Sequence, residues 1–497
     1  CGVLGAGGAD FMKGALQNFL SAQSENGFID LKPGLGGQRS RRLAQPLLAT
    51  LAYQLSMATS DFTWIAACYQ ALLRFVQAWF SPEHDRDLDG FPEWDHPLQT
   101  GFEEAPMYDC FQIVLPGTGI SAVESPALAS FLHRECASLL KIARHTGNQE
   151  GVEWLQARIA SLASLIESTW DAKASTYRYR DHATHKSLPE LEIFYFNQAG
   201  DYTLKKSLQT SRRLQIRIHG KQQATRPVHI QIHGRGLKGP VSESIPANRF
   251  YWQNGNAYVT TQSVFKSIKS VQINGLIEGD EGWITSPDYT QEDLSLILPL
   301  WAEVPSAKRA KLIVEKNLLK RYLQPFGLSI APSTGQTGEC PGLDKILLPW
   351  NQLIIEGLVL YGYRKEAAMI VERLMAVMLA SLQETGALHT IYPAAEGSPS
   401  GESFAVRSLA PVGLFLRVVG IRQIGKNEVI LEGNNPFPWP VTVKYQGMII
   451  TCHSEDVVVT FSTGHTITVS GSGPHRVSLA LFSEATNREK GELTHES

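Results

Sequence analysis

Apolar residues recur every three or four positions through the first third of the chain. Between residues 9 and 173 this spacing returns repeatedly, as in Leu47, Leu51 and Leu55. A stripe of this kind predicts amphipathic helices that bury one face. A Gly- and Pro-rich stretch at 81–106 interrupts the pattern and predicts a long loop between helices.

The pattern changes near residue 188, where apolar and polar residues begin to alternate. LQIRIHG and VHIQIHGRG show this period of two with β-branched residues, which predicts strands. Helical spacing returns at 291–322 and 346–384, and the alternation resumes from residue 423 in segments such as VTVKYQGMIITC. We therefore expect one β insertion within a helical domain and a second β segment after it.

These elements predict a mainly α fold class, an (α/α)6 toroid of helix pairs with an inserted β-sandwich-like domain and a C-terminal β domain. The expected parts are 1–187 and 291–422 for the toroid, 188–290 for the inserted β domain, 423–485 for the C-terminal β domain and 486–497 for a polar tail. About ten toroid helices are expected, where six closed pairs need twelve.

The composition is that of a globular protein. Of 497 residues, 43% are hydrophobic and 19% are charged, so low-complexity disorder is excluded. No apolar run reaches the length of about 18 residues that predicts a membrane span. The formal net charge is −3 and the basic runs are short, which argues against nucleic acid as a partner.

Six cysteines are scattered without CxxC spacing, so neither a zinc site nor a disulfide framework is predicted. This usage favours a cytoplasmic location. The chain begins at Cys1 without a methionine, and two interpretations stay open. Either the natural start is missing, which fits the expected shortage of helices, or Cys1 is the anchor of a mature lipoprotein, which leaves a secreted form open.

The densest polar stretch, residues 84–110, mixes carboxylates with aromatic side chains. Its members are Asp85, Asp87, Asp89, Glu93, Trp94, Asp95, Phe102, Glu103, Glu104, Tyr108 and Asp109. Sugar chemistry uses both types, because aromatic faces stack on sugar rings and a pair of carboxyl groups cleaves the glycosidic bond. An acidic, solvated loop between helices is the alternative interpretation.

Within this stretch, Asp85-x-Asp87-x-Asp89-Gly90 matches the first half of a calcium-binding loop. The twelfth position holds His96, where such loops carry a bidentate Glu. Asx turns explain the same spacing without a metal. The metal hypothesis therefore names Asp85, Asp87 and Asp89 as Ca2+ ligands, while no cofactor is expected to be required.

Two further polar islands lie on the second helical part. HTIYPAAEGSPSGESF, at 389–404, offers His389, Tyr392, Glu396 and Glu402 on a loop. LLPWNQLIIEGLVLYGY, at 347–363, places Trp350 and Asn351 at the start of a helix and Glu356 inside it. Because Glu356 sits among Ile and Leu, we expect it to be paired in the core or to line a cavity.

The three islands together resemble glycoside hydrolase family 63, the group of mannosylglycerate hydrolases, processing α-glucosidases and debranching-enzyme-like relatives. GQRSRRLAQPLLATLAY resembles the family's Gln-Pro-Pro helix start, here Gln45-Pro46. TGFEEAPMYD resembles its Ser-Gly-aromatic/Met-Asp-Asn/Asp-Ser-Pro-Arg-Tyr motif. PWNQLIIEGLVLYGY resembles its Trp-x-Asn…Gly-Leu…Tyr-Gly helix, and YPAAEGSPSGESFAVRSLAPVGLFL its final loop and helix. The resemblance covers the helical parts of the chain.

The resemblance implies an (α/α)6 barrel that hydrolyses an α-linked glucoside or mannoside with inversion. The family's general acid matches Glu103, with Met107 where the family has Arg. The family's base position holds Thr390, so Glu402 is the expected base and Glu396 the second choice. The expected substrate-binding residues are Gln45, Trp94, Asp95, Tyr108, Asp109, Trp350, Asn351, Tyr392 and Glu396.

Two other functions stay open at this point. Because Thr390 cannot act as a base, the chain is alternatively a catalytically inactive sugar-binding protein on the same fold. A polysaccharide lyase would use a Tyr–His pair, which Tyr392 and His389 supply. In each case the expected partner is an oligosaccharide or glycoside, with no nucleic acid and no membrane.

Overall fold

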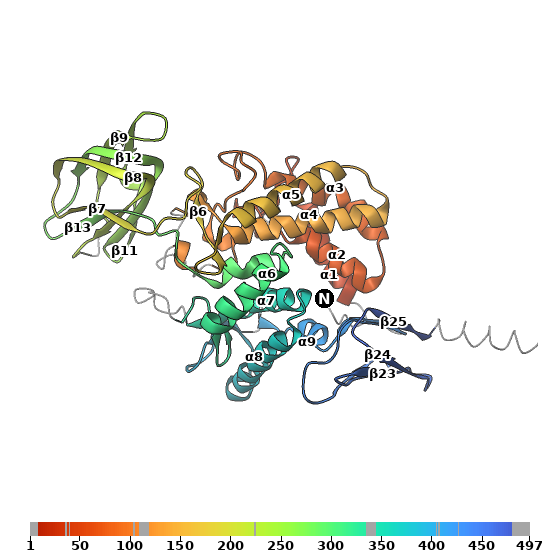
Figure 1. Cartoon of the computed structure of the whole chain (residues 1–497). Coiled ribbons are helices and arrows are strands. Elements are labelled where there is room, and N and C mark those ends of the chain that lie inside the picture. The colour runs from red at the N-terminus through yellow and green to blue at the C-terminus, as the bar shows by residue number, and fades with distance from the viewer. Residues whose placement is uncertain are drawn as a thin grey trace, which may run out of the picture.

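The computed structural model describes residues 8–34, 37–38, 40–102, 105–108, 119–222, 225–333, 344–403, 405, 408–425 and 427–479. Helices are gathered in one body, an antiparallel sheet stands beside them, and a smaller group of strands lies on the other side (Figure 1). No helix in these described ranges is long and apolar enough to span a membrane.

The helical body follows the predicted apolar stripes. Its α-helices are α1 (Gly8–Ser21), α2 (Leu48–Thr59), α3 (Thr63–Ala78), α4 (Pro126–Thr146), α5 (Val152–Ser168), α6 (Ala307–Leu312), α7 (Leu348–Leu360), α8 (Arg364–Thr385) and α9 (Val412–Val418). A 3-10 helix, η5 (Leu294–Leu300), and a π-helix, η6 (Ile313–Tyr322), also belong to it. Shorter 3-10 helices elsewhere in the chain are η1 (Pro97–Gln99), η2 (Pro106–Tyr108), η3 (Ile120–Ala122) and η4 (Ala247–Arg249). Pro126 begins α4 and Gly147, at φ 71°, ends it, as expected of these residue types.

A carboxylate from one helix caps the start of another. α2 has no side-chain cap of its own at Leu47. Instead, the Glu135 oxygens on α4 accept hydrogen bonds from the N–H groups of Ala49 and Thr50 at 2.8 and 2.7 Å. Carboxyl oxygens at this end of a helix accept hydrogen bonds from N–H groups that have no partner within the helix. Glu135 therefore ties α4 to α2 in the core.

The inserted sheet has its own hydrophobic core. Its strands are β7 (Leu191–Phe196), β8 (Gly200–His219), β9 (His229–Arg235), β10 (Pro240–Ile245), β11 (Tyr251–Gln253), β12 (Asn256–Asn274) and β13 (Glu281–Ser286). The order is β10-β9-β12-β8-β13-β7, with β11 on β12. Inward residues such as Ile216, Ile218 and Ile284 are fully buried. Register shifts along β12 accompany its passage from one part of the sheet to the other.

A buried ion pair anchors this sheet to the helical body. Arg213 on β8 and Asp181 lie 2.6 Å apart, and their side chains are 2% and 3% exposed. The Tyr289 hydroxyl donates a second hydrogen bond to the same Asp181 oxygen at 2.9 Å. Burial of a charge requires such partners.

Short strands run through the rest of the chain. Early in the chain they are β1 (Pro33–Gly34), β2 (Gly37–Gln38), β3 (Val123–Glu124), β4 (Trp170–Asp171), β5 (Thr176–Tyr177) and β6 (Arg180–Asp181). Later they are β14 (Leu323–Gln324), β15 (Gly327–Leu328), β16 (Lys345–Leu347), β17 (His389–Pro393) and β18 (Ser400–Ser403). The C-terminal strands are β19 (Ile421–Ile424), β20 (Glu428–Leu431), β21 (Val441–Tyr445), β22 (Met448–Cys452), β23 (Asp456–Thr460), β24 (Thr466–Ser470) and β25 (His475–Ser478).

The predicted mainly α fold class is therefore wrong. Helices account for 36% of the chain and strands for 30%, so the fold mixes α and β structure. The long strands β8 and β12 alone contain 20 and 19 residues. The short strands within the helical part, such as β3, β6 and β14, show too few alternations to stand out in a sequence, which is why they were not predicted.

Candidate functional site

Two distant residues hold the backbone just before Glu103. The side-chain amide of Gln45, immediately before α2, donates a hydrogen bond to the Thr100 carbonyl at 2.9 Å. The indole N–H of Trp350, on α7, donates to the Gly101 carbonyl at 2.8 Å. Gly101 has φ 62°, a conformation that favours glycine. The 84–110 stretch, the 347–363 island and the Gln45-Pro46 segment therefore meet at residues 100–101.

Aromatic rings pack around this point. The Phe102 ring centroid lies 4.7 Å from that of Trp350, and Phe131 on α4 lies 5.9 Å from Trp350. Trp94 contacts Phe131 edge-on at 6.4 Å. Trp94, Tyr108 and Trp350 are each at most 3% exposed, so in this structure they pack in the core of the helical body.

The polar groups of Asn351 and Tyr392 also form hydrogen bonds within the protein. Asn351 accepts from Leu328 N–H at 2.8 Å and donates to the Leu328 carbonyl at 2.9 Å. This exchange fixes the strand β15 against the start of α7. The Tyr392 hydroxyl accepts from the backbone N–H of His389 at 3.0 Å. The structure thus joins Tyr392 to the His389 backbone, while the His389 ring faces the Thr385 hydroxyl at 3.4 Å.

The two predicted base residues are exposed. Glu402 lies on β18, where its backbone N–H donates to the Thr390 hydroxyl at 3.1 Å. Glu396 is exposed in the turn between β17 and β18. Glu103, Glu104 and Asp109 lie outside the described residues, so the distance from the predicted acid to either base stays a prediction.

Asp95 belongs to a paired network. Its oxygens lie 2.9 Å from His84 Nδ1 and 2.7 Å from Arg86 Nη2. Burial raises the pKa of this carboxyl, but the hydrogen bonds and charges of His84 and Arg86 outweigh it and hold the pKa below its usual value. Gln99 closes the loop by accepting the N–H groups of Asp95 and His96 at 2.8 Å. Asp95 is therefore held as a carboxylate.

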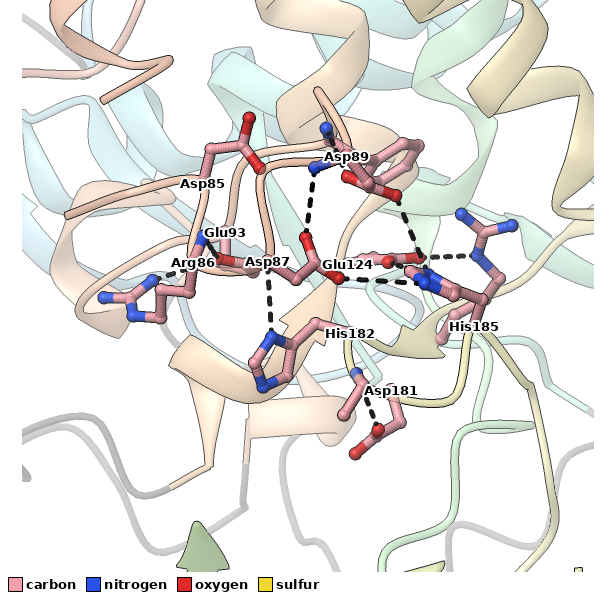
Figure 2. A network of polar contacts seen from close by, with 12 residues as sticks. Asp85, Arg86, Asp87, Asp89, Glu93, Glu124, Asp181, His182 and His185 are labelled. Atoms are coloured by element: carbon pink, nitrogen blue, oxygen red, sulfur yellow. Dashed lines mark hydrogen bonds and ion pairs between the residues drawn. The ribbon is translucent and has the colours of Figure 1, made fainter. Parts of the chain in front are cut away.

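The start of the acidic loop, the 84–110 stretch, lies beside two further residues of metal-ligating type. Asp87, Asp89, Glu124 and His185 each place one ligand atom within 4.8 Å of the others (Figure 2). Glu124 comes from β3 and His185 from the turn after β6, and these strands pair in antiparallel register. Asp85, the third predicted ligand, lies apart and accepts the Gly90 N–H at 3.1 Å. The structure thus brings together two of the three predicted ligands with two that were missed.

This donor set fits a cation only in part. Carboxylate oxygens suit Ca2+, whereas an imidazole nitrogen suits transition metals better. His185 Nδ1 lies 2.7 Å from Glu124 Oε1, so the imidazole already pairs with that carboxylate. Burial raises the pKa of Glu124 to about 7, although Arg180, at 2.6 Å, opposes the rise. A bound cation would replace the His185 contact.

A second buried carboxyl lies beside the acidic loop. Glu93 is fully buried, and burial raises its pKa to about 8 against the opposing charge of Arg86. Its Oε2 lies 3.1 Å from Arg86 Nη1, and its Oε1 lies 3.6 Å from His182 Nδ1 (Figure 2). Burial therefore favours the protonated form of Glu93, which lies between the acidic loop and the turn after β6.

A cavity of about 640 Å³ lies away from the predicted site residues, which do not line it. Side chains along α2, α4 and α7 form its walls, together with residues of α9 and β19. Glu356 faces it while also accepting the Trp301 indole N–H at 2.9 Å. The two alternatives for Glu356, pairing and cavity lining, thus hold together.

Sequence reasoning missed Glu124 and His185. Neither belongs to a motif, and each reaches the acidic loop only because two-residue strands pair. The one signal available was their residue type, which is too common to select them. Gln45 and Trp350, in contrast, stood in recognisable motifs.

A family model described as the mannosylglycerate hydrolase MGH1-like glycoside hydrolase domain matches residues 8–197. No curated protein matches the sequence.

Among solved structures, the glucose complex of GH63 mannosylglycerate hydrolase from Thermus thermophilus aligns with a TM-score of 0.51 at 15% identity. It covers 83% of this chain and 90% of that one. The same enzyme in complex with Tris and D-glycerate aligns with a TM-score of 0.51 at 15% identity, over 82% of this chain and 89% of that one. An uncharacterized conserved protein from the same organism aligns with a TM-score of 0.52 at 15% identity, over 83% of this chain and 90% of that one. At this identity the likeness shows a shared fold. The chain thus has the fold of the family 63 glycoside hydrolases, and its residues 8–197 match an MGH1-like glycoside hydrolase domain.

Proposed function

We propose that this chain is a glycoside hydrolase that cleaves an α-linked glucoside or mannoside with inversion. The observation that carries the proposal is the convergence of Gln45 and Trp350 on the carbonyls of Thr100 and Gly101. A catalytic acid needs a backbone held in a fixed position, because small displacements cost large factors in rate. Residues 100–101, whose backbone these two hydrogen bonds hold, lead directly to Glu103 in the sequence.

In the proposed mechanism, Glu103 protonates the leaving oxygen, and a carboxylate on the β17–β18 hairpin activates water on the opposite face of the sugar. Inversion requires the two carboxyl groups to stand about 6.5–9.5 Å apart. Glu402 is the first candidate for the base and Glu396 the second. Because both are exposed, we expect a movement of the β17–β18 hairpin to bring one of them to the water when substrate binds.

The predicted sugar contacts divide into two groups. Gln45, Asn351 and Trp350 hydrogen-bond to backbone carbonyls, so we assign them the role of positioning the site. Direct contact with sugar hydroxyls is proposed for Asp95 and Asp109. Stacking on the sugar is proposed for Trp94, Tyr108 and Tyr392, whose buried rings must first be uncovered by movement of the loops around them.

A panel of α-glucosides and α-mannosides tests the acid. The panel includes glucosyl- and mannosylglycerate, because the similar solved structures hold glucose and D-glycerate. We expect Glu103→Gln to lower turnover by about 10²–10⁴-fold with sugar binding retained. Glu104→Gln is the matched control, because it removes a neighbouring carboxyl of the same size. An equal loss in both variants contradicts the assignment.

The base is tested in the same assay. Glu402→Gln should lower turnover far more than Glu396→Gln, and the reverse result moves the base to Glu396. A wild-type protein that binds sugars without hydrolysing any of them instead supports the non-catalytic alternative. The observation favouring that alternative is Thr390, whose hydroxyl accepts the Glu402 N–H at the position where the family carries its base.

A divalent cation at Asp87, Asp89 and Glu124 is a separate proposal. Their oxygens suit Ca2+ once His185 turns away from Glu124. One further oxygen in this loop, Asp85 Oδ1, is buried without a hydrogen-bond partner in the described structure. The cation would brace the acidic loop and take no part in bond cleavage.

A further inference from the structure

Five side chains form a straight row across the inserted sheet. Trp283 on β13 stands opposite Tyr195 on β7 and opposite Arg217 on β8. Arg217 stands opposite Tyr258 on β12, and Tyr258 opposite Tyr251 on β11. Residues directly opposite one another point to the same face of a sheet. The aromatic row is therefore Tyr195, Trp283, Arg217, Tyr258 and Tyr251, on five adjacent strands.

The row occupies the outer face of this sheet. The residues on either side of Arg217, Ile216 and Ile218, are fully buried in the core of the inserted domain, as is Ile284 next to Trp283. Successive residues of a strand alternate between faces, so the row points the other way. Tyr195 is 42% exposed, and none of the four aromatic members belongs to the hydrophobic core of the sheet. The strands that carry it lie in the sheet that stands beside the helices (Figure 1).

Neighbouring side chains hold the row in place. The rings of Tyr195 and Trp283 lie 5.4 Å apart, and His219 packs edge-on to Trp283 at 5.3 Å. The Arg217 guanidinium lies 5.9 Å from the Tyr258 ring centre and 3.4 Å from a Glu190 oxygen. With strands about 4.8 Å apart, the row presents planar groups at a regular spacing. Fixed planar groups bind with little loss of conformational entropy.

We propose that the aromatic row binds an extended, uncharged glycan chain along its length, as a site separate from the glycoside-cleaving centre. Sugar rings offer apolar C–H faces for the four aromatic side chains and hydroxyl groups for the polar ones. Arg217 and the tyrosine hydroxyls supply donors in the plane of the row, and His219 and Glu281 flank it. A chain of sugar units can contact several members at once, so that weak contacts add.

The charges on this face select the glycan over other partners. Arg217 is paired with Glu190, and His219 stands opposite Glu281 on the neighbouring strand. The row therefore carries no uncompensated positive charge of the kind that single-stranded nucleic acid or an anionic surface needs. Its charged and hydroxyl-bearing members equally disfavour a dry, apolar protein interface. An uncharged, hydroxyl-rich chain matches both properties.

Binding of the full-length protein to polysaccharides tests the proposal. The probes are granular starch, immobilised yeast α-mannan and microcrystalline cellulose, measured as depletion of protein from solution. We expect the wild-type chain to bind at least one of them, and Trp283→Ala and Tyr195→Ala each to weaken that binding about tenfold. Trp283→Phe should keep most of it. Leu237→Ala, an exposed apolar residue outside the row in the same domain, is the matched control.

The inactive variant Glu103→Gln should bind as the wild type does, which separates this site from the cleavage reaction. Three outcomes overturn the proposal: no binding to any probe, equal binding by Trp283→Ala and Leu237→Ala, or loss of binding only in Glu103→Gln. A dimer in sedimentation that Trp283→Ala dissociates also overturns it, because the row then covers a second copy of the chain. Unchanged melting temperatures of the row variants exclude misfolding as the cause.

Discussion

The Trp350 indole N–H donates a hydrogen bond to the Gly101 carbonyl at 2.8 Å, across 249 residues of sequence. This single contact connects the start of α7 to the loop that leads to Glu103. The Phe102 ring packs on the same indole at 4.7 Å. Trp350 therefore fixes both the backbone and the side chain of the segment that the proposed acid follows.

Trp350→Phe removes the donor and keeps an aromatic ring. We expect turnover to fall about 10–100-fold, because the segment before Glu103 loses one of the two side-chain hydrogen bonds that hold its backbone. Loss of the hydrogen bond to the exposed Gly101 also lowers the unfolding free energy, by about 0.5–1.5 kcal/mol. The matched control is Trp79→Phe, because the Trp79 N–H is buried without a hydrogen-bond partner in the described structure. If both variants keep wild-type turnover, the hydrogen bond from Trp350 to Gly101 has no role in catalysis.

Much of the fold could be predicted from periodicity alone. The alternating segments LQIRIHG and VHIQIHGRG lie in β8 and β9, and the helical stripes before residue 173 lie in α1–α5. Long elements repeat their pattern often enough to be recognised. Two-residue strands such as β3 and β6 do not, and η6 has a π-helical geometry that no pattern predicts. The overestimate of helix content follows from this difference.

The features of the candidate site also divide into those that the sequence could predict and those that it could not. Gln45, Trp350 and the 100–102 segment stand in motifs, and the structure brings them into contact. What the motifs could not predict is that the Gln45 amide and the Trp350 indole would bind backbone carbonyls. The hydrogen-bond partners of a side chain depend on how distant elements pack together, and a single sequence does not reveal that packing.

Glu135 should make stability depend on pH in a defined direction. Burial raises its pKa to about 7 in the folded chain, from 4.5, although hydrogen bonds from Thr50 and Ala49 oppose the rise. Between these values the folded state keeps a proton that the unfolded state releases. Its contribution is therefore complete below about pH 4.5 and is lost as pH rises to about 7, by about 3 kcal/mol.

Urea denaturation of the wild type and Glu135→Gln from pH 4.5 to 8 measures this effect. The amide cannot ionise but still offers an acceptor to the start of α2. The difference in unfolding free energy should move in favour of the variant as pH rises, and then stay level above about pH 7. A difference that does not change with pH shows that the Glu135 pKa is ordinary.

The Arg213–Asp181 pair should anchor the inserted sheet. Arg213→Ala leaves a buried carboxylate with one partner fewer, at an expected cost of about 3–5 kcal/mol. Limited proteolysis should then cut near residues 188–190, where the chain enters the sheet. Lys311→Ala, which removes a solvent-exposed ion pair with Glu315, is the control and should leave the melting temperature unchanged. Equal melting temperatures for both variants contradict the anchoring role.

The cation proposal predicts a thermal shift. Ca2+ should raise the melting temperature relative to EDTA, because a ligand that binds only the folded chain stabilises it. Asp89→Asn and Glu124→Gln should each reduce the shift, while Asp85→Asn should reduce it less. A larger effect of Mn2+ would indicate that His185 remains a ligand. Identical melting in Ca2+, Mn2+ and EDTA contradicts cation binding.

Proton NMR of the sugar released at the start of the reaction shows directly whether the chain hydrolyses a glycoside with inversion. The wild-type chain is incubated with α-glucosides and α-mannosides, including the glycerate glycosides, and the first anomer to appear is recorded. We expect the β-anomer first, because a water activated by Glu402 or Glu396 attacks the face opposite to the leaving group. Appearance of the α-anomer first contradicts inversion, and release of no sugar from any substrate contradicts the assignment as a hydrolase.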